Sequence, residues 1–378
     1  MKNAVLIFGV CCALLIAGCK KDSSGSEPSG GINVSGTVQA FGGQVISGAA
    51  VQCYAGTAVT GSPAASGTSN ASGVWQVAVN AAGRYTIVIS AAGRPTAYIN
   101  VVIPSGQTSV AAGTTILAAQ QITGTVNDAQ TGSAISGATV RFFVGSNNDT
   151  TGYRFPDLTT NAQGQFTTAL TLGTYVYAIH AAGRVPLVAN RSVTDTTATQ
   201  FTTTVTQPVP AGQMRIVLNW GSKPSDLDSH LTGDSTAVAG RPRYHVYYAN
   251  RVVQAANGDT VAYLDHDDVT SYGPETITIF KFFPGTLRYK IHDYSNRNTT
   301  GSHFMSDSSG ATLRVYTSAG LVREDHIVTG IAGNQWYAYD INGATQAVTF
   351  VNTIRDGVSN PADSSFRPVA LPPKQAAK

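Results

Sequence analysis

The chain has 378 residues, of which 42% are apolar and 12% are charged, and its formal net charge is +3. This length predicts two or three domains rather than one. The small net charge, without a dense Lys/Arg patch interleaved with aromatic residues, argues against nucleic acid as a partner. Short segments rich in Val and Thr alternate with clusters of Gly, Asn, Asp and Ser, which predicts an all-β fold.

The first 18 residues have the features of an export signal. Lys2 supplies a positive charge, and the apolar run Ala4–Ile16 is too short for a comfortable transmembrane helix. The run ends in LIAGC, which resembles a bacterial lipoprotein signal. The resemblance implies that residues 1–18 are a signal peptide and that Cys19 is acylated, which would anchor the chain to a membrane surface. A plain secretory signal or a membrane anchor is the alternative.

The residues after Cys19 bear on localisation. Residue 20 is Lys rather than Asp, which favours the outer membrane over retention at the inner membrane. The sequence KKD that starts there resembles the charged export tags of surface lipoproteins in Bacteroidota-like bacteria. We therefore expect a lipid-anchored protein of the bacterial outer membrane, at its periplasmic face or on the cell surface. Residues 19–31 are polar and rich in Gly and Ser, which predicts a flexible tether.

Cysteine usage agrees with that assignment. Cys11 and Cys12 would leave with the signal peptide and Cys19 would be acylated, so Cys53 would remain alone and no internal disulfide could form. Cys53 lies between apolar positions of an expected strand. That setting favours a small buried hydrophobic side chain over a reactive thiol.

An internal repeat covers residues 32–118 and 119–205. Four motifs recur in the same order at offsets of 88 to 91 residues: VSGTV as ITGTV, ISGAAV as ISGATV, TSNASG as TTNAQG, and GRYTIVISAAGR as GTYVYAIHAAGR. Each unit is large enough for its own β core, and its short strands predict a two-sheet sandwich. The N-x-x-G motifs are expected to be turns between strands, followed by Trp75 or Phe166 entering the core.

These motifs are similar to those of the carboxypeptidase regulatory-like family, transthyretin-like sandwiches found beside metallopeptidases and within bacterial surface proteins. The resemblance implies a β-sandwich fold and a spacer or binding role rather than catalysis. Folds of this kind are grouped with carbohydrate-binding-like sandwiches. The sequence itself shows no exposed aromatic platform that would establish sugar binding.

The remainder of the chain differs in composition. Residues 206–212, TQPVPAG, predict a stiff Pro-containing linker. Residues 213–354 form an expected third β domain that holds six of the seven histidines. Residues 355–378 carry four of the 16 prolines and few aromatic residues, which predicts a disordered tail.

The third domain contains a cluster of polar residues. In the segment DLDSHL, Asp226, Asp228 and His230 occupy alternate positions and should share one face of a strand, with Leu227 and Leu231 on the other. Two later segments, LDHDD and GPE, add Asp265, His266, Asp267 and Glu275. If the first of these segments is extended, its residues 265 and 267 share a face, whereas Asp268 lies on the other face or in a turn.

Three segments in order resemble the bacterial YfaP-like domain: WGSKPSDLDSHL, LDHDDVTSYGPETI and PGTLRYKIHDYS. The resemblance spans about 140 residues and implies the fold and the family. This family is largely uncharacterised, so its name adds little about mechanism. The chain departs from the family pattern in two places. Leu287 stands in the PGTLRY segment with its Tyr displaced to position 289, and His266 is an additional histidine. Neither departure changes the expected fold.

Three interpretations of the cluster stay open. Calcium prefers six to eight oxygen ligands. Five carboxylates would supply several of them: Asp226, Asp228, Asp265, Asp267 and Glu275. Alternatively, His230 and His266 would join an Asp around zinc, although no HExxH or CxxC spacing supports this. In the third interpretation the residues form only a structural hydrogen-bond network, with His230 held by Asp265 or by the loop of Glu275. Calcium is thus the candidate cofactor that the sequence offers.

The sequence as a whole predicts a cell-envelope lipoprotein with three consecutive β-sandwich domains. We expect a protein that is not an enzyme, that binds an envelope protein or glycan or has a structural role, and whose first two domains space the third from the membrane. G-x-S-x-G, phosphate-loop and dinucleotide-binding motifs are absent from the sequence. An envelope hydrolase of glycan or peptide that uses the Asp/His cluster is one alternative, and a carbohydrate-binding module is the other.

Overall fold

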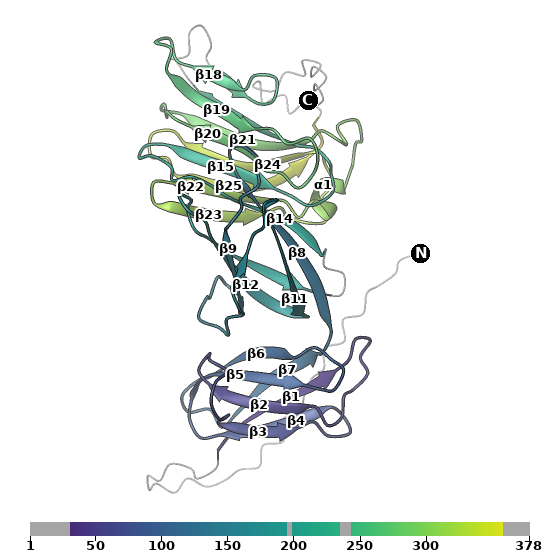
Figure 1. The fold of residues 1–378 in the computed structure, drawn as a ribbon. Helices are drawn as coiled ribbons and strands as arrows, with labels where there is room; N and C mark the ends of the chain where they lie inside the picture. Colours follow the sequence, from purple (N-terminus) through teal and green to yellow (C-terminus); the bar gives the residue numbers. More distant parts are fainter. Residues whose placement is uncertain (1–30, 195–198, 235–242, 358–378) are drawn as a thin grey trace, which may run out of the picture.

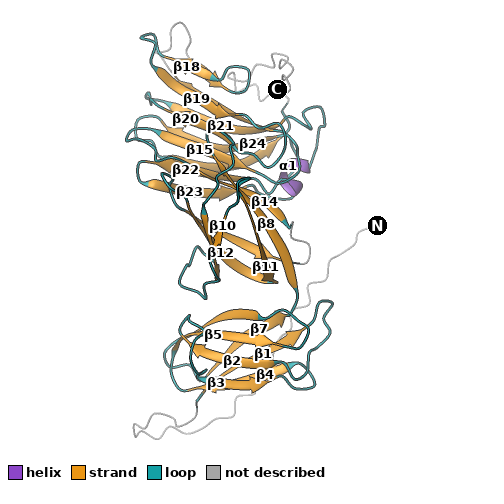
Figure 2. Ribbon diagram, in the orientation of Figure 1, coloured by secondary structure: helices purple, strands orange, loops and turns teal. Residues whose placement is uncertain are grey.

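The structure is a computed structural model that describes residues 31–194, 199–234 and 243–357. The expected signal peptide, Cys19, nearly all of the tether and the tail from residue 358 lie outside the described residues. The described residues form strands β1 to β25 and one short helix, α1 (Phe304–Ser308), which confirms the all-β fold (Figure 2). None of their helices is long and apolar enough to cross a membrane.

The first sandwich is built from β1 to β7. One sheet has the order β4-β1-β7 and the other β3-β2-β5-β6, and β1 pairs antiparallel with β4 but parallel with β7. Side chains from both sheets meet in one core that includes Trp75 and Ile87. The strands are β1 (Ile32–Gln39), β2 (Ala50–Ala55), β3 (Ala65–Thr68), β4 (Val74–Val79), β5 (Gly83–Ser90), β6 (Ala97–Ile103) and β7 (Ser109–Ile116).

The second sandwich repeats this topology. Its sheets have the orders β11-β8-β14 and β10-β9-β12-β13, and β8 pairs antiparallel with β11 and parallel with β14, as β1 does with its two neighbours. Its core includes Phe142 and Phe166. The strands are β8 (Ala119–Asp128), β9 (Thr139–Val144), β10 (Leu158–Thr159), β11 (Gln165–Thr171), β12 (Gly173–His180), β13 (Leu187–Val193) and β14 (Gln200–Val205).

The repeated motifs have the same physical role in both units. The side chain of Asn70 accepts two backbone N–H groups in the turn before β4, and that of Asn161 does the same before β11. Trp75 and Phe166 follow these turns and are buried, as predicted. The glycine of each G-T-V motif lies against that ring, since a Cβ at Gly124 would be 2.2 Å from Phe166. The repeated glycine therefore makes room for the repeated aromatic residue.

The third sandwich is larger. Its two sheets lie at one end of the molecule (Figure 1) and have the orders β18-β19-β20-β15-β22-β23 and β17-β16-β21-β24-β25. They enclose a core that includes Trp336 and Tyr289. Its strands are β15 (Met214–Asn219), β16 (Leu227–Asp234), β17 (Arg243–Val246), β18 (Val252–Gln254), β19 (Thr260–His266), β20 (Glu275–Ile279), β21 (Thr286–Asp293), β22 (Thr312–Thr317), β23 (Gly320–His326), β24 (Gln335–Asn342) and β25 (Val348–Arg355).

Regular structure extends slightly beyond the expected end of the third domain at residue 354. The last strand includes Arg355, the carboxylate of Asp356 accepts the backbone N–H of Gly301, and Gly357 N–H donates to the side chain of Asn334. Residues 355–357, which we predicted to begin a disordered tail, are therefore held by hydrogen bonds to the third sandwich.

The second and third sandwiches share a small hydrophobic core. Ala129 of the second sandwich packs with Val217 and Tyr316 of the third and with Val209 of the connecting segment 206–212. The side chain of Thr276 in β20 donates a hydrogen bond to the carbonyl of Ala129. The segment expected to be a stiff linker thus lies packed between two sandwiches, because its Val209 and Thr206 are buried.

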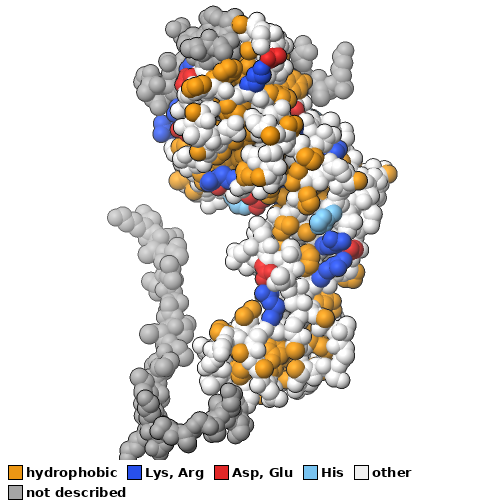
Figure 3. Space-filling view, turned by 90° about the vertical axis from the view of Figure 1, so that its left-hand side faces the viewer, with side chains coloured by type: hydrophobic (Ala, Val, Ile, Leu, Met, Phe, Trp, Pro, Cys, Tyr) orange, Lys and Arg blue, Asp and Glu red, His pale blue; other side chains and the backbone are white. Residues whose placement is uncertain are grey.

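The first sandwich meets the second through polar and aromatic contacts. The rings of Tyr98 and Tyr153 stack with centroids 4.1 Å apart, and Arg84 forms an ion pair of 3.1 Å with Asp149. On the face shown in Figure 3, Lys and Arg side chains are scattered in small groups along the stack of sandwiches. Cys53 is fully buried in the first core, where burial raises the pKa of its thiol to about 11, so it is a buried hydrophobic side chain as predicted.

Candidate functional site

The polar cluster in the structure centres on β16, which the sequence predicted, and on the neighbouring strand β21, which it did not. Their antiparallel register places Asp228 opposite His292 and His230 opposite Lys290. Leu227 and Leu231 of β16 belong to the hydrophobic core, as the alternation predicted. The polar face of these strands is buried as well, because the polar residues just named are at most 7% exposed.

Two sets of potential metal ligands meet at Asp228. Donor atoms of Asp228, His230 and His292 all lie within 4.8 Å of one another, and so do those of Asp228, Asp267 and Glu275. Asp267 is half-buried and the other residues are buried. One carboxylate therefore faces two imidazoles and two further carboxylates, brought together from both sheets of the sandwich. The contribution of His292 was not predicted from the sequence.

A stack of rings lies beside Asp228. The Nδ1 atom of His230 is hydrogen-bonded to Nε2 of His245 at 2.9 Å, and the rings of His245 and Tyr247 are stacked with centroids 4.1 Å apart. Burial and then the positive charge of Lys290 lower the pKa of His245 to about 4. His245 is therefore neutral at pH 7, and its Nε2 can accept the proton that Nδ1 of His230 donates.

Asp265 and His266 lie apart from this cluster. The carboxylate of Asp265 accepts hydrogen bonds from Thr278 at 2.6 Å and from Gln130 of the second sandwich at 3.4 Å. The ring of His266 packs against the second sandwich, since a Cβ at Gly132 would be 2.5 Å from it. The pairing of β19 with β20 has an irregular register at Leu264 to His266. This bulge explains why residues 265 and 267, expected on one face, point to different places.

Asp226 also belongs to different surroundings. Its backbone N–H donates to the hydroxyl of Ser295, and its charge lies near Asp293. Burial, with a contribution from Asp226, raises the pKa of Asp293. Of the five carboxylates that the sequence offered to calcium, only Asp228, Asp267 and Glu275 come together.

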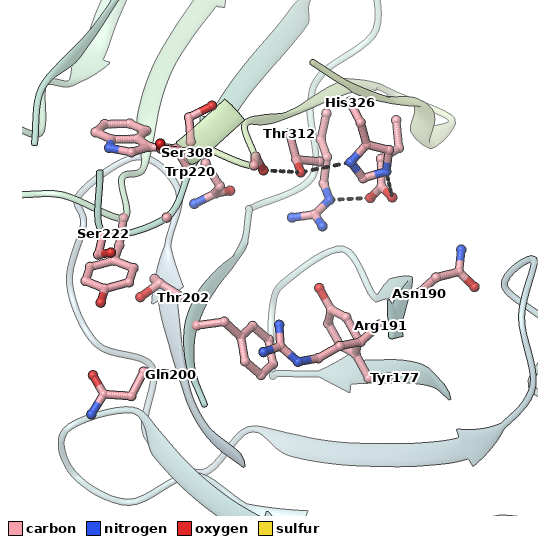
Figure 4. Close-up of a pocket in the computed structure, with 18 of the residues that line it drawn as sticks. Tyr177, Asn190, Arg191, Gln200, Thr202, Trp220, Ser222, Ser308, Thr312 and His326 are labelled. Carbon is pink, nitrogen blue, oxygen red and sulfur yellow. Dashed lines mark hydrogen bonds and ion pairs between the residues drawn. The ribbon is translucent and has the colours of Figure 1, made fainter. Parts of the chain in front are cut away.

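A second feature is a cleft between the second and third sandwiches, with a volume of about 570 Å³ (Figure 4). In Figure 4 the residues of the second sandwich lie below the cleft and those of the third lie above it. The second sandwich contributes Tyr177, Asn190, Arg191, Gln200, Phe201 and Thr202. The third contributes Asn219, Trp220, Ser222, Tyr272, Ser308, Thr312, Arg314, Glu324 and His326.

Several of these side chains are held in place by neighbours. The guanidinium of Arg191 lies 4.1 Å from the centroid of the Phe201 ring. Nε of Arg314 donates to Glu324 at 2.6 Å, and His326 contacts the same carboxylate at 3.5 Å (Figure 4). The side-chain carbonyl of Asn219 accepts the hydroxyl of Thr204 at 2.8 Å, while its buried Nδ2 has no hydrogen-bond partner among the described residues. The cleft is thus lined by ordered amide, hydroxyl and aromatic groups.

Fold and site together define a protein of three stacked β-sandwiches with an interdomain cleft and a buried Asp/His cluster. No family model and no curated protein matches the chain. Among solved structures it is similar to a streptococcal ancillary pilin, with 14% identity over 48% of this chain and 63% of that chain and a TM-score of 0.24. The Bacillus anthracis TIE protein is 11% identical over 69% of this chain and 45% of that chain, with a TM-score of 0.23.

A shaft pilin from Lactobacillus rhamnosus GG is 15% identical over 48% of this chain and 99% of that chain, with a TM-score of 0.20. This chain covers less than two thirds of the length of the first two proteins. Likeness at these TM-scores carries no inference about what the chain binds.

Proposed function

We propose that this chain is a lipid-anchored protein of the bacterial envelope that binds a ligand without catalysing a reaction. The LIAGC sequence at Cys19 supports the anchor, and the repeated motifs support a carboxypeptidase regulatory-like assignment for the first two sandwiches. The three ordered motifs support a YfaP-like assignment for the third. The cleft of about 570 Å³ between the second and third sandwiches is the observation on which the binding function rests.

The lining of the cleft favours a saccharide as its ligand. Amides such as Asn190 and hydroxyls such as Thr202 and Ser222 suit the hydroxyl groups of a sugar, and the half-buried Tyr272 offers a ring to its C–H faces. The volume lies within the range of roughly 300–1,000 Å³ that is usual for small-molecule sites. In the envelope setting, the ligand class is a glycan unit. In this proposal the second and third sandwiches form the binding site together, and only the first sandwich acts as a spacer.

The acidic residues do not support a hydrolase. Glycoside hydrolysis places two carboxyl groups on opposite sides of a bound sugar, roughly 5–9.5 Å apart. Asp228 and Glu275 have oxygens within 4.8 Å of each other and are fully buried, so no polymer can lie between them. Glu324 in the cleft is held by Arg314 and His326, and it is the acidic residue among the described lining residues. These observations favour binding over hydrolysis.

The cleft proposal predicts a loss of glycan binding when Arg191 is changed to Gln. The substitution removes a charged donor from the cleft, and a hydrogen bond to a charged group contributes about 1.5–3 kcal/mol, or roughly 10- to 150-fold in affinity. The mature chain would be screened against arrayed peptidoglycan fragments and outer-membrane saccharides, and each hit measured by calorimetry. Arg154→Ala, an exposed residue away from the cleft, is the matched control. Equal affinities for the two variants would refute the assignment of the cleft.

The anchor is tested separately through Cys19→Ala. We expect the variant to move from the membrane fraction to the soluble fraction, because it lacks the thiol that would carry the acyl chain. Cell fractionation with fatty-acid labelling measures this, and Cys53→Ala is the control because that cysteine is buried. Retention of the Cys19→Ala protein in the membrane would contradict lipid anchoring. Protease treatment of intact cells distinguishes the cell surface from the periplasmic face.

A further inference from the structure

The groups around Asp228 carry an inference that is independent of the cleft. Its donor atoms lie within 4.8 Å of those of His230 and His292, and also of those of Asp267 and Glu275. The five side chains come from β16, β20, β21 and the segment after β19, so both sheets of the sandwich contribute. Oxygen and nitrogen donors from separate strands thus converge on one buried carboxylate.

The charges of this cluster favour a divalent cation. Asp228, Asp267 and Glu275 would together carry three negative charges within 4.8 Å, a separation at which like charges repel strongly unless they are neutralised. Lys290 is a buried cation on the same face of the sheet, with its ammonium 4.2 Å from the centroid of the Tyr337 ring. A divalent ion bound among the three carboxylates would offset this repulsion.

The donor types favour a transition metal over calcium. Calcium takes oxygen ligands, whereas two imidazoles with a carboxylate suit zinc, iron and related ions. In metal sites, a ligating histidine generally uses its second ring nitrogen for a hydrogen bond that fixes the ring. His230 has a hydrogen bond of this kind, from its Nδ1 to His245 at 2.9 Å, and its Nε2 would be the coordinating atom.

One member of the cluster borders a cavity. Asp267 is half-buried and lines a cavity of about 410 Å³ between the second and third sandwiches. That cavity is bordered by Asn127 and Thr202 of the second sandwich and by residues 266–273 of the third. The most accessible of the five donors therefore faces this cavity.

We propose that Asp228, His230 and His292 bind a divalent transition-metal ion, with Asp267 and Glu275 supplying further oxygen ligands or balancing its charge. The ion would join β16 to β21 and both to the six-stranded sheet. It would therefore be a structural centre of the third sandwich, and His245 is a positioning residue that orients His230.

The test uses the mature chain stripped with a chelator and titrated separately with Zn²⁺, Co²⁺ and Ca²⁺. We expect one Zn²⁺ per chain, an increase in the melting temperature on binding, and visible absorption bands from bound Co²⁺. X-ray absorption of the Zn²⁺-loaded protein should show imidazole nitrogens at about 2.0–2.1 Å. That measurement on the unmodified chain does not depend on whether any variant folds.

Variants then assign the ligands. His292→Ala should weaken Zn²⁺ binding by more than roughly 100-fold, and His245→Phe should weaken it by roughly 10–100-fold, the usual effect of losing an orienting partner. His303→Ala, an exposed histidine of the same domain, is the control and should bind normally. The proposal is overturned if Ca²⁺ alone binds, if no ion binds, or if His292→Ala keeps the affinity of the unmodified chain. Glycan binding by the cleft is measured independently, so either proposal can fail alone.

Discussion

Replacing Glu324 by Ala is expected to destabilise the third sandwich by about 3–5 kcal/mol, because it would leave the buried guanidinium of Arg314 without its carboxylate. Arg314 is 5% exposed, and its Nε donates to Glu324 at 2.6 Å. The buried guanidinium of Arg314 has lost most of its hydration, and the carboxylate of Glu324 compensates for that loss. Chemical denaturation followed by tryptophan fluorescence measures the loss of stability.

The matched control removes both charges. Arg314→Met combined with Glu324→Leu replaces the ion pair by apolar groups of similar volume, an exchange that is often neutral or stabilising. We expect the double variant to regain most of the stability lost by Glu324→Ala. If Glu324→Ala lowers the free energy of unfolding by less than about 1 kcal/mol, the pair behaves as a solvated surface ion pair.

The same pair gives stability a pH dependence. Burial alone would raise the pKa of Glu324, but the hydrogen bond from His326 and the charge of Arg314 outweigh it and lower the pKa to about 2. The folded-state value is thus below the unfolded value of about 4.5. The pair therefore stabilises the fold fully above about pH 4.5, and this contribution is lost as the pH falls toward 2. The double variant should lack this component when unfolding is compared across that pH range.

Local patterns predicted the sandwiches well. The alternation that buries Trp75 and Phe166, and the N-x-x-G turns before them, depend on neighbouring residues and are readable directly from the sequence. The same is true of β16, where Leu227 and Leu231 face the core. Features set by periodicity and turn chemistry over a few residues could therefore be inferred without knowing which strands pair.

The candidate site depended on pairings that no local pattern reveals. His292 lies opposite Asp228 only because β16 pairs with β21, and 64 positions separate these two residues. A bulge in β19 directs Asp265 away from Asp267, and a one-residue irregularity of this kind reverses the face that a side chain occupies. The sequence thus supplied the residue types of the cluster but not its membership.

The cleft and the domain contact were also beyond local patterns. Segment 206–212 has the proline content of a linker, yet Val209 is buried between two sandwiches. The cleft takes residues from both of these sandwiches, including strands β12, β13, β14, β22 and β23. Such contacts depend on how two folded units dock, which composition does not encode. The predicted spacer role of the second sandwich rested on treating it as independent of the third.

Arg215→Ala is expected to separate the second sandwich from the third, because this residue holds the connecting segment on the third sandwich. Its guanidinium is buried and donates to the hydroxyl of Thr278 at 2.9 Å, to that of Thr206 at 2.7 Å and to the carbonyl of Gln207 at 3.0 Å. Truncation would leave these acceptors, and the nearby carboxylate of Asp265, without a buried cation. Because a hydrogen bond from a charged donor contributes about 1.5–3 kcal/mol, we expect the loss of these three bonds to cost about 3–5 kcal/mol.

Calorimetry distinguishes this uncoupling from general unfolding. If the two sandwiches unfold together in the unmodified chain, the variant should show the transition split into two, and binding at the interdomain cleft should fall with it. Arg215→Lys keeps the charge but lacks the planar fork that reaches three acceptors at once, so it should give an intermediate result. Arg154→Ala, exposed in the second sandwich, should leave the transitions unchanged. If Arg215→Ala also leaves the transitions unchanged, the hydrogen bonds of Arg215 contribute little to the contact between the sandwiches. The contact then rests on the apolar residues Ala129, Val209, Val217 and Tyr316.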